Sequence, residues 1–453
     1  MKRIIIIITL LVGLCACNAR LTPPQISIPT DYSYAEGVVT DSLGVDFAWW
    51  ENFGDSTLND LIMRAIANNR NLLVAASRIE QARIELGNVR STYLPSFAFE
   101  VSAEGNYTKE TRIEQQYQIS PTMSWEIPLF GAFRHSRAAA YASLCGTKWA
   151  FRGVMLSLTT EVATSYFTLL QYRSSLEVAR STYQLRKISA ALMDSMYRYG
   201  FASAVERQQS YSLADAAAVD IPNYERAVVQ TAAVLSTLMG EYPLDSIVES
   251  AAALRVDRLP LEVPIGLPSS LLERRPDVLE AYYGVEQAAA KVNIERVARF
   301  PTLSLTASGG VLSSTIEGLT SSNPFSWSAA AHLLQPIYAF GRLKRNELSA
   351  REDYYQAVKQ YEQSILQAFA DVSDALSQIS TYAREVERYA AMLESDQRVY
   401  ELAKALYSNG MNSYTDLVDA ERTLYDSQMS YAEVCAQQYM AYVTLFKALG
   451  GGW

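Results

Sequence analysis

Histidine and cysteine, which often hold metals or reactive protons, are scarce in this chain. It has 2 histidines and 4 cysteines among 453 residues. His135 and His332, which we place at strand edges, lack the spacing of a zinc site, and no phosphate-binding loop or nucleophile elbow is present. Cys145 and Cys435 suggest no metal site or disulfide framework, and we expect both to stay unpaired. We therefore predict that the chain is not an enzyme, with no catalytic residue, no metal site and no cofactor.

Long apolar runs and excess positive charge are also missing. After Leu14 the sequence has no apolar stretch long enough for a membrane-spanning helix, which needs about 18 residues or more. If the chain crosses a membrane, it must therefore do so as a β-barrel. The formal net charge is −9, and an acidic exported chain is a poor ligand for nucleic acid. We expect no nucleic-acid partner.

The N-terminus is typical of an exported lipoprotein. A basic start is followed by a short apolar run from Ile4 to Leu14, and the Leu-x-Ala-Cys ending resembles a bacterial lipobox. We predict that residues 1–16 are a lipoprotein signal peptide and that Cys17 carries the lipid. Acyl chains on Cys17 would anchor the chain to outer-membrane lipid, with 17–46 as a lipid-anchored extended N-terminal segment. The alternative is an ordinary signal peptide with incidental cysteines.

The rest of the chain repeats itself. Glu80-Gln81-Ala82 recurs 206 positions later at 286–288, and Phe130-Gly131 recurs 210 positions later at 340–341. Glycines at the ends of predicted helices follow the second spacing, as with Gly200 and Gly410. A duplication this regular predicts two copies of one structural unit around a shared axis.

Hydrophobic periodicity gives each copy the same order of elements. A helical pattern over 47–94 ends at Pro95, and two segments that alternate apolar and polar residues follow, such as 117–127. Long helices are predicted over 138–199 and 343–409, each on the order of 90–100 Å. Each long helix ends at a glycine turn, and a second helix returns from it. Pro222 should kink the first return helix.

The alternating segments allow two interpretations. They are half-buried hairpins of a soluble sheet, or they are strands of a transmembrane barrel with an apolar outer face and a polar lumen. The 117–127 segment has the length that spans a bilayer. Four strands cannot close a barrel alone, so several protomers would have to share one.

Several motifs resemble one known family. The segment Leu271–Val278, with sequence LLERRPDV, is followed by Glu286-Gln287-Ala288 and Phe300-Pro301. This pattern is similar to the signature of TolC-like outer-membrane efflux proteins, in particular the lipoprotein (NodT/OprM-type) subgroup that partners resistance–nodulation–division pumps. Residues 49–61, 125–131 and 335–342 match further motifs of the family, and the resemblance covers essentially all of 17–453.

The resemblance implies a fold class that is mainly α with a transmembrane β-barrel. The duplicated helix–hairpin–long helix–helix units of a homotrimer would form a 12-strand β-barrel and a long periplasmic α-helical barrel. The first repeat would span 47–243, a connecting equatorial segment 244–267 and the second repeat 268–453. The implied partners are a periplasmic adaptor (membrane fusion) protein and an inner-membrane resistance–nodulation–division pump. The implied location is the cell outer membrane, with the chain lipid-anchored and extending into the periplasm.

The predicted functional residues surround the two glycine turns. Asp416 and Asp419 share a helix face; acidic residues are also common there because the helix dipole stabilises them. The resemblance matches both to the family's acidic periplasmic constriction. It also matches Glu206 to an acidic residue that pairs with a basic group in some relatives. That basic position is Asn412 here, so Tyr407 or amide hydrogen bonds would hold the aperture.

Gly200 and Gly410 are predicted to adopt the left-handed backbone that ends a helix. The resemblance implies that these helix tips face the adaptor. The favoured function is an outer-membrane exit duct of a tripartite efflux system, passively conducting drugs or other small molecules. A type I secretion or metal-ion efflux duct of the same fold is one alternative, and a lipid-anchored coiled-coil scaffold is another.

Overall fold

The computed structural model describes residues 48–108, 112–242, 274–320 and 325–451. The predicted signal peptide, Cys17, the 17–46 segment and the 244–267 connection lie outside these residues. None of the helices in the described part of the chain is long and apolar enough to cross a membrane.

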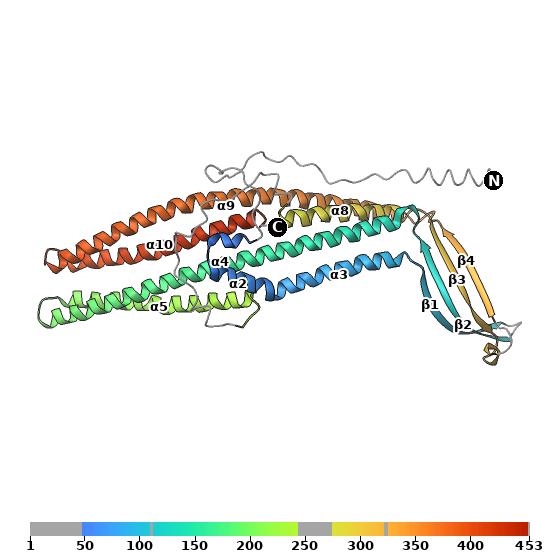
Figure 1. Cartoon of the computed structure of the whole chain (residues 1–453), viewed down its shortest axis with the longest axis horizontal. Helices are drawn as coiled ribbons and strands as arrows, with labels where there is room; N and C mark the ends of the chain where they lie inside the picture. The colour runs from blue at the N-terminus through green and yellow to red at the C-terminus, as the bar shows by residue number, and fades with distance from the viewer. Residues whose placement is uncertain (1–47, 109–111, 243–273, 321–324, 452–453) are drawn as a thin grey trace. The chain divides into compact units, whose positions relative to one another are not determined.

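Each repeat has the predicted order of elements (Figure 1). The first comprises η2 (Trp49–Phe53), α2 (Ser56–Asn68), α3 (Arg70–Thr92), β1 (Ser96–Thr108), β2 (Arg112–Ile127), η3 (Leu129–Gly131), α4 (Ala132–Arg198) and α5 (Ala204–Leu238). The second comprises α8 (Pro276–Val297), β3 (Thr302–Ser313), η6 (Glu317–Leu319), β4 (Phe325–Leu334), α9 (Arg342–Ser408) and α10 (Tyr414–Ala448). The predicted fold class, mainly helical with two hairpins in a duplicated unit, is confirmed.

The described residues fall into two compact units. Unit 1 contains the described residues of 77–149 and 280–364, and unit 2 contains those of 48–76, 150–279 and 365–451. The strands lie in unit 1, where they form one antiparallel sheet in the order β1-β2-β3-β4. The sheet pairs the two hairpins through β2 and β3, with Ile127 opposite Leu303.

The two faces of this sheet differ in character, as the alternation predicted. Apolar residues stand opposite one another across the strands, for example Phe97 with Met123 and Trp125 with Leu305. The other face carries polar pairs such as Ser308 and Ser328, whose hydroxyl oxygens lie 2.8 Å apart. Because side chains alternate along a strand, one register fixes both faces of the sheet.

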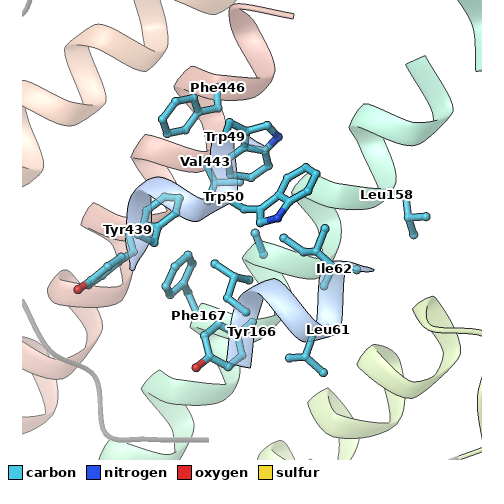
Figure 2. Packing of buried hydrophobic residues seen from close by; sticks show 14 of the residues in the cluster. Trp49, Trp50, Leu61, Ile62, Leu158, Tyr166, Phe167, Tyr439, Val443 and Phe446 are labelled. Carbon is cyan, nitrogen blue, oxygen red and sulfur yellow. The ribbon is translucent and has the colours of Figure 1, made fainter. Parts of the chain in front are cut away.

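The core of unit 2 forms where the short N-terminal elements meet the helices of both repeats. Trp49 stacks on Phe446 of α10, with ring centroids 5.1 Å apart (Figure 2). Phe167 of α4 stacks on Tyr439 of α10 at 4.7 Å. Burying aromatic side chains of this size stabilises a fold by roughly 1.5–3 kcal/mol each. The aromatic residues of η2 therefore pack against both α4 and α10 and join them in one hydrophobic core.

Contacts as well as sequence repeat between the two halves. The Asn69 side chain donates to the carbonyl oxygen of Leu238 at 2.7 Å, and Arg275, 206 positions later, donates to that of Ala448 at 3.1 Å. Phe130 and Phe340 are the two non-glycine residues of the described chain with positive φ, at 55° and 48°. Both stand where the chain leaves a hairpin for a long helix. The two repeats therefore keep equivalent turns and equivalent hydrogen bonds from a side chain to the carbonyl end of a helix.

Two sequence predictions need correction. The helix expected over 47–94 is divided, because Asp55 and Asn69 accept hydrogen bonds from backbone N–H groups two or three residues on and so start new helices. His135 lies in the first turn of α4, buried, and not at a strand edge.

Candidate functional site: the helix tips of unit 2

Both glycine turns have the backbone that the sequence predicted. Gly200 has φ 78° and Gly410 has φ 72°. The amide of Phe201 donates to the carbonyl of Met196 at 2.8 Å, and that of Met411 to Leu406 at 2.9 Å. These bonds cap the carbonyl ends of α4 and α9 in a Schellman arrangement. A Cβ built on either glycine meets nothing within 4 Å, so the turns need glycine for its conformation and not for space.

Asp416 and Glu206 are equivalent residues of two matching helix caps. The Ser413 hydroxyl accepts from the Asp416 amide at 3.2 Å, and the Asp416 carboxylate accepts from the Ser413 hydroxyl at 2.6 Å. Ser203 and Glu206 form the same capping box at the start of α5. Both carboxylates therefore stabilise the first turn of a helix within one chain. The Ser-x-x-acid spacing was readable from the sequence and would have identified both caps.

Asp419 takes no part in the capping box of α10. Its side chain is 65% exposed, and the nearest basic atom is Nη1 of Arg422 at 3.9 Å. Asn412, which is half-buried, makes no side-chain hydrogen bond to the other residues that the structure describes. Asp416 and Asp419 stand in the first turns of α10. They share a helix face, as their spacing predicted.

Tyr407 links the tips of the two repeats. Its hydroxyl donates to the sulfur of Met193 on α4 at 3.9 Å, and its ring lies 5.5 Å from that of Tyr414. Burial, followed by the charge of Glu421, raises the pKa of Tyr414 to about 12. These neutral aromatic side chains hold the second-repeat turn against α4 and α5 through apolar packing with Leu213.

A buried ionic network lies behind the tips, and the sequence analysis missed it. Nε of Arg186 on α4 donates to Glu421 of α10 at 2.8 Å, and Nη1 donates to the Leu213 carbonyl of α5 at 3.2 Å. The Arg186 side chain is only 4% exposed. Its guanidinium lies over the ring of Tyr425, whose hydroxyl donates to Asp220 at 2.7 Å.

This network joins three long helices from both repeats. Burial, and then the hydrogen bond to Asp220, raises the pKa of Tyr425. The Tyr425 hydroxyl therefore remains a protonated donor through neutral pH. The network gives no local sequence signal, because Arg186 and Glu421 are 235 positions apart.

Comparison with known proteins supports the resemblance seen in the sequence. A family model described as "Outer membrane efflux protein" matches residues 61–241 and 267–451. The starts of the two matches are 206 positions apart and their ends 210, the same offsets as the internal duplication.

Similar proteins include outer-membrane components of several efflux systems. The solvent efflux pump outer membrane protein SrpC of Pseudomonas putida is 32% identical over 413 residues, which cover 89% of this chain and 87% of that protein. The cation efflux system protein CusC of Escherichia coli is 27% identical over 451 residues, covering 98% and 97%. A crystal structure of a membrane protein from Pseudomonas aeruginosa superposes with a TM-score of 0.87 at 28% identity, covering 96% and 98%.

The helix tips, the paired hairpins and the family model that matches both repeats define a class of duct-forming efflux proteins. The chain belongs to the outer membrane efflux protein family. Its role in efflux, its outer-membrane location and its nature as a passive duct and not an enzyme, all predicted from the sequence, are confirmed at the level of the family.

Proposed function

We propose that this chain is the exit duct of a tripartite efflux system and conducts small molecules through the outer membrane as a homotrimer. A periplasmic adaptor and an inner-membrane resistance–nodulation–division pump would supply the substrate and the energy. The domain boundaries of the proposal are a first repeat at 47–243 and a second at 268–453. The connecting segment at 244–267 would lie at the equator of the trimer.

The exposed apolar face of the sheet is the main observation that supports this proposal. Its side chains are 66–77% exposed in the single chain, namely Phe97, Phe99, Val101, Phe325, Trp327 and Leu333. Strands β1 and β4 also leave an edge unpaired in the sheet order. Exposed apolar faces and open edges are unstable in water. Three copies would pair β4 of one chain with β1 of the next and direct the apolar face toward lipid.

Small apolar molecules are the favoured substrates, because SrpC is a solvent efflux protein. Metal ions are the alternative substrates, because CusC is a protein of a cation efflux system. Deleting the gene should raise the cellular accumulation of an apolar fluorescent dye, and restoring the chain should reverse it. If deletion instead sensitises cells to transition-metal salts with unchanged dye accumulation, the metal-ion alternative is correct. If neither changes, the chain is not an efflux duct.

Within the duct, we propose that Asp416 and Asp419 line the periplasmic constriction. Three chains would place six carboxylates around one axis, which favours cations there. Asp419→Asn should therefore lower the cation preference measured as a reversal potential in planar bilayers. Because Asp419 is exposed and weakly paired, the free energy of unfolding should fall by less than about 0.5 kcal/mol.

A variant with the same change of charge away from the tips provides the control. Glu394→Gln removes an exposed carboxylate that pairs with Arg398, and it lies 14 residues before Ser408, the end of α9. It should leave the reversal potential unchanged. We assign Glu206, with Tyr407 and Asn412, to holding the aperture. If Asp419→Asn and wild type have equal reversal potentials, Asp419 is only a solvated helix residue. The tips at Gly200 and Gly410 would face the adaptor.

We also propose that Cys17 is acylated and anchors the chain to the outer membrane. The Leu-x-Ala-Cys sequence before residue 18 supports this assignment. Cells fed a radioactive fatty acid should label the wild-type chain, and Cys17→Ser should lose the label. Cys15→Ser, as the neighbouring-thiol control, should keep it. Equal labelling of Cys17→Ser would disprove the anchor.

A further inference from the structure

The four connections between strands and helices lie at one end of the sheet in unit 1. Strand β2 ends at Ile127, opposite Leu303 near the start of β3, and Thr302 pairs with Leu334 at the end of β4. Strand β1 starts at Ser96 on the same side. Helices α3, α4, α8 and α9 therefore all meet the sheet at one end (Figure 1).

The helical sides of these connections are strongly basic. The segments 83–95, 128–137, 292–301 and 335–345 contain nine Arg or Lys residues and two Glu residues, in a chain whose net charge is −9. Eight of the nine basic residues are exposed, and we name them the basic collar: Arg83, Arg90, Arg134, Arg137, Arg299, Arg342, Lys344 and Arg345. Positive charge is thus concentrated where the strands end.

Most of the collar has no counter-charge in the part of the chain that the structure describes. Arg83 pairs with Glu80, Arg299 pairs with Glu347, and Arg345 donates to a backbone carbonyl. The other five have no ion-pair partner among the described residues: Arg90, Arg134, Arg137, Arg342 and Lys344. Arg134 and Arg137 are three apart in α4, so they share a helix face.

The acidic side chains near the connections form no ion pair with these five residues in the part of the chain that the structure describes. Glu347 is buried and already contacts three arginines, at 2.8–3.4 Å. Burial alone would raise the pKa of Glu347, but the hydrogen bonds from those arginines hold it below its ordinary value. Glu126 is on the strand face opposite to that of Trp125 and Ile127. The collar therefore has spare positive charge.

Apolar and aromatic side chains are exposed at the same connections. Ile337 is 94% exposed, Tyr338 76% and Phe340 79%. Leu94, between α3 and β1, is 64% exposed. Aromatic residues beside Arg and Lys are typical of the boundary between hydrocarbon and water in a membrane. This combination favours a lipid surface over a soluble anion, which would not cover the apolar side chains.

We propose that the basic collar binds the phosphate groups of anionic phospholipids at the membrane surface where the strands end. This inference rests on the proposed function, in which the sheet lies in the membrane. A guanidinium presents two parallel N–H donors to phosphate oxygens. The neighbouring apolar side chains would contact the start of the acyl chains. The collar would thereby fix the depth of the sheet in the membrane.

Lipid retention by the reconstituted full-length chain tests this proposal. The chain is placed in nanodiscs of phosphatidylcholine mixed equally with phosphatidylglycerol, and native mass spectrometry identifies the lipids that remain bound. Wild type should retain phosphatidylglycerol over phosphatidylcholine by roughly fivefold or more at low salt, the factor that one basic side chain near the surface supplies. High salt should reduce this preference.

The collar variant replaces four residues that have no ion-pair partner, as Arg134→Gln, Arg137→Gln, Arg342→Gln and Lys344→Gln. It should lose most of the preference. A control with the same change of charge away from the collar is Arg70→Gln, Lys187→Gln, Arg384→Gln and Arg388→Gln, and it should keep the preference. If the glutamine variant fails to fold, the two smaller variants Arg134→Gln/Arg137→Gln and Arg342→Gln/Lys344→Gln should each lose part of the preference.

Channel conductance of the same samples separates the two proposals. Equal retention of both lipids by a wild-type trimer that conducts would refute the collar and leave the duct intact. An unchanged preference in the folded collar variant would also refute it. A wild-type chain that neither inserts nor conducts would refute the duct and the collar together.

Discussion

Gly240→Ala should lower the free energy of unfolding by about 2–5 kcal/mol, because the added methyl group meets both a conformational and a steric cost. Gly240 has φ 69°, and a Cβ there would stand 2.4 Å from the backbone oxygen of Asn68. The left-handed conformation costs an alanine roughly 1–2 kcal/mol, and the backbone contact adds an overpacking cost of about 1–3 kcal/mol. Denaturant titration followed by circular dichroism measures the change.

Three other glycines supply a graded control. A Cβ on Gly200 or Gly410 meets nothing, so alanine there should cost only the conformational share, about 1–2 kcal/mol. Gly450 is intermediate, because its Cβ would stand 3.1 Å from the Cα of Arg275. Equal losses at Gly200 and Gly240 would contradict the close approach of α5 to the end of α2.

Glu421→Gln should cost about 2–4 kcal/mol, because it leaves the buried guanidinium of Arg186 without its counter-charge. The loss expected for breaking a buried ion pair is about 3–5 kcal/mol, and we reduce it because Glu421 keeps 17% of its side chain exposed. Hydrogen exchange should increase in α4, α5 and α10 near the tips. Mass spectrometry of the exchanged protein would locate that increase.

Two further variants distinguish the ion pair from simple packing. Glu394→Gln breaks an exposed pair with Arg398 and should change stability by less than about 1 kcal/mol. Arg186→Met combined with Glu421→Leu removes both charges and should recover most of the loss, because no unpaired charge remains buried. Equal losses from Glu421→Gln and from the double variant would show that the charges contribute little.

The duplication was the most predictive feature of the sequence. The offsets of 206 and 210 located equivalent turns, and the alternating segments located the sheet and its apolar face. Hydrophobic periodicity predicts these elements well because long amphipathic helices and half-buried strands repeat the same spacing of apolar residues many times. The recurrence of Phe130-Gly131 at 340–341 marked equivalent positions, but it did not predict the left-handed backbone of the two phenylalanines, since Phe alone gives no signal for that backbone.

The tips were harder to read from the sequence. Glu206 was assigned by resemblance to an aperture contact, and the structure adds a capping box with Ser203 that the sequence analysis did not predict. The Arg186 network depends on the register between α4 and α10, which no local pattern determines. The breaks at Asp55 and Asn69 were missed because the apolar spacing continues through them, although both residue types favour helix starts.

Reconstitution of the purified chain in planar lipid bilayers tests the proposed duct most directly. Size-exclusion chromatography with light scattering should first give the mass of three chains. The same fraction should then produce stepwise, cation-preferring conductance, because three copies are needed to close the sheet and bring the acidic tips around one axis. A stable monomer in mild detergent that never conducts would contradict the proposal.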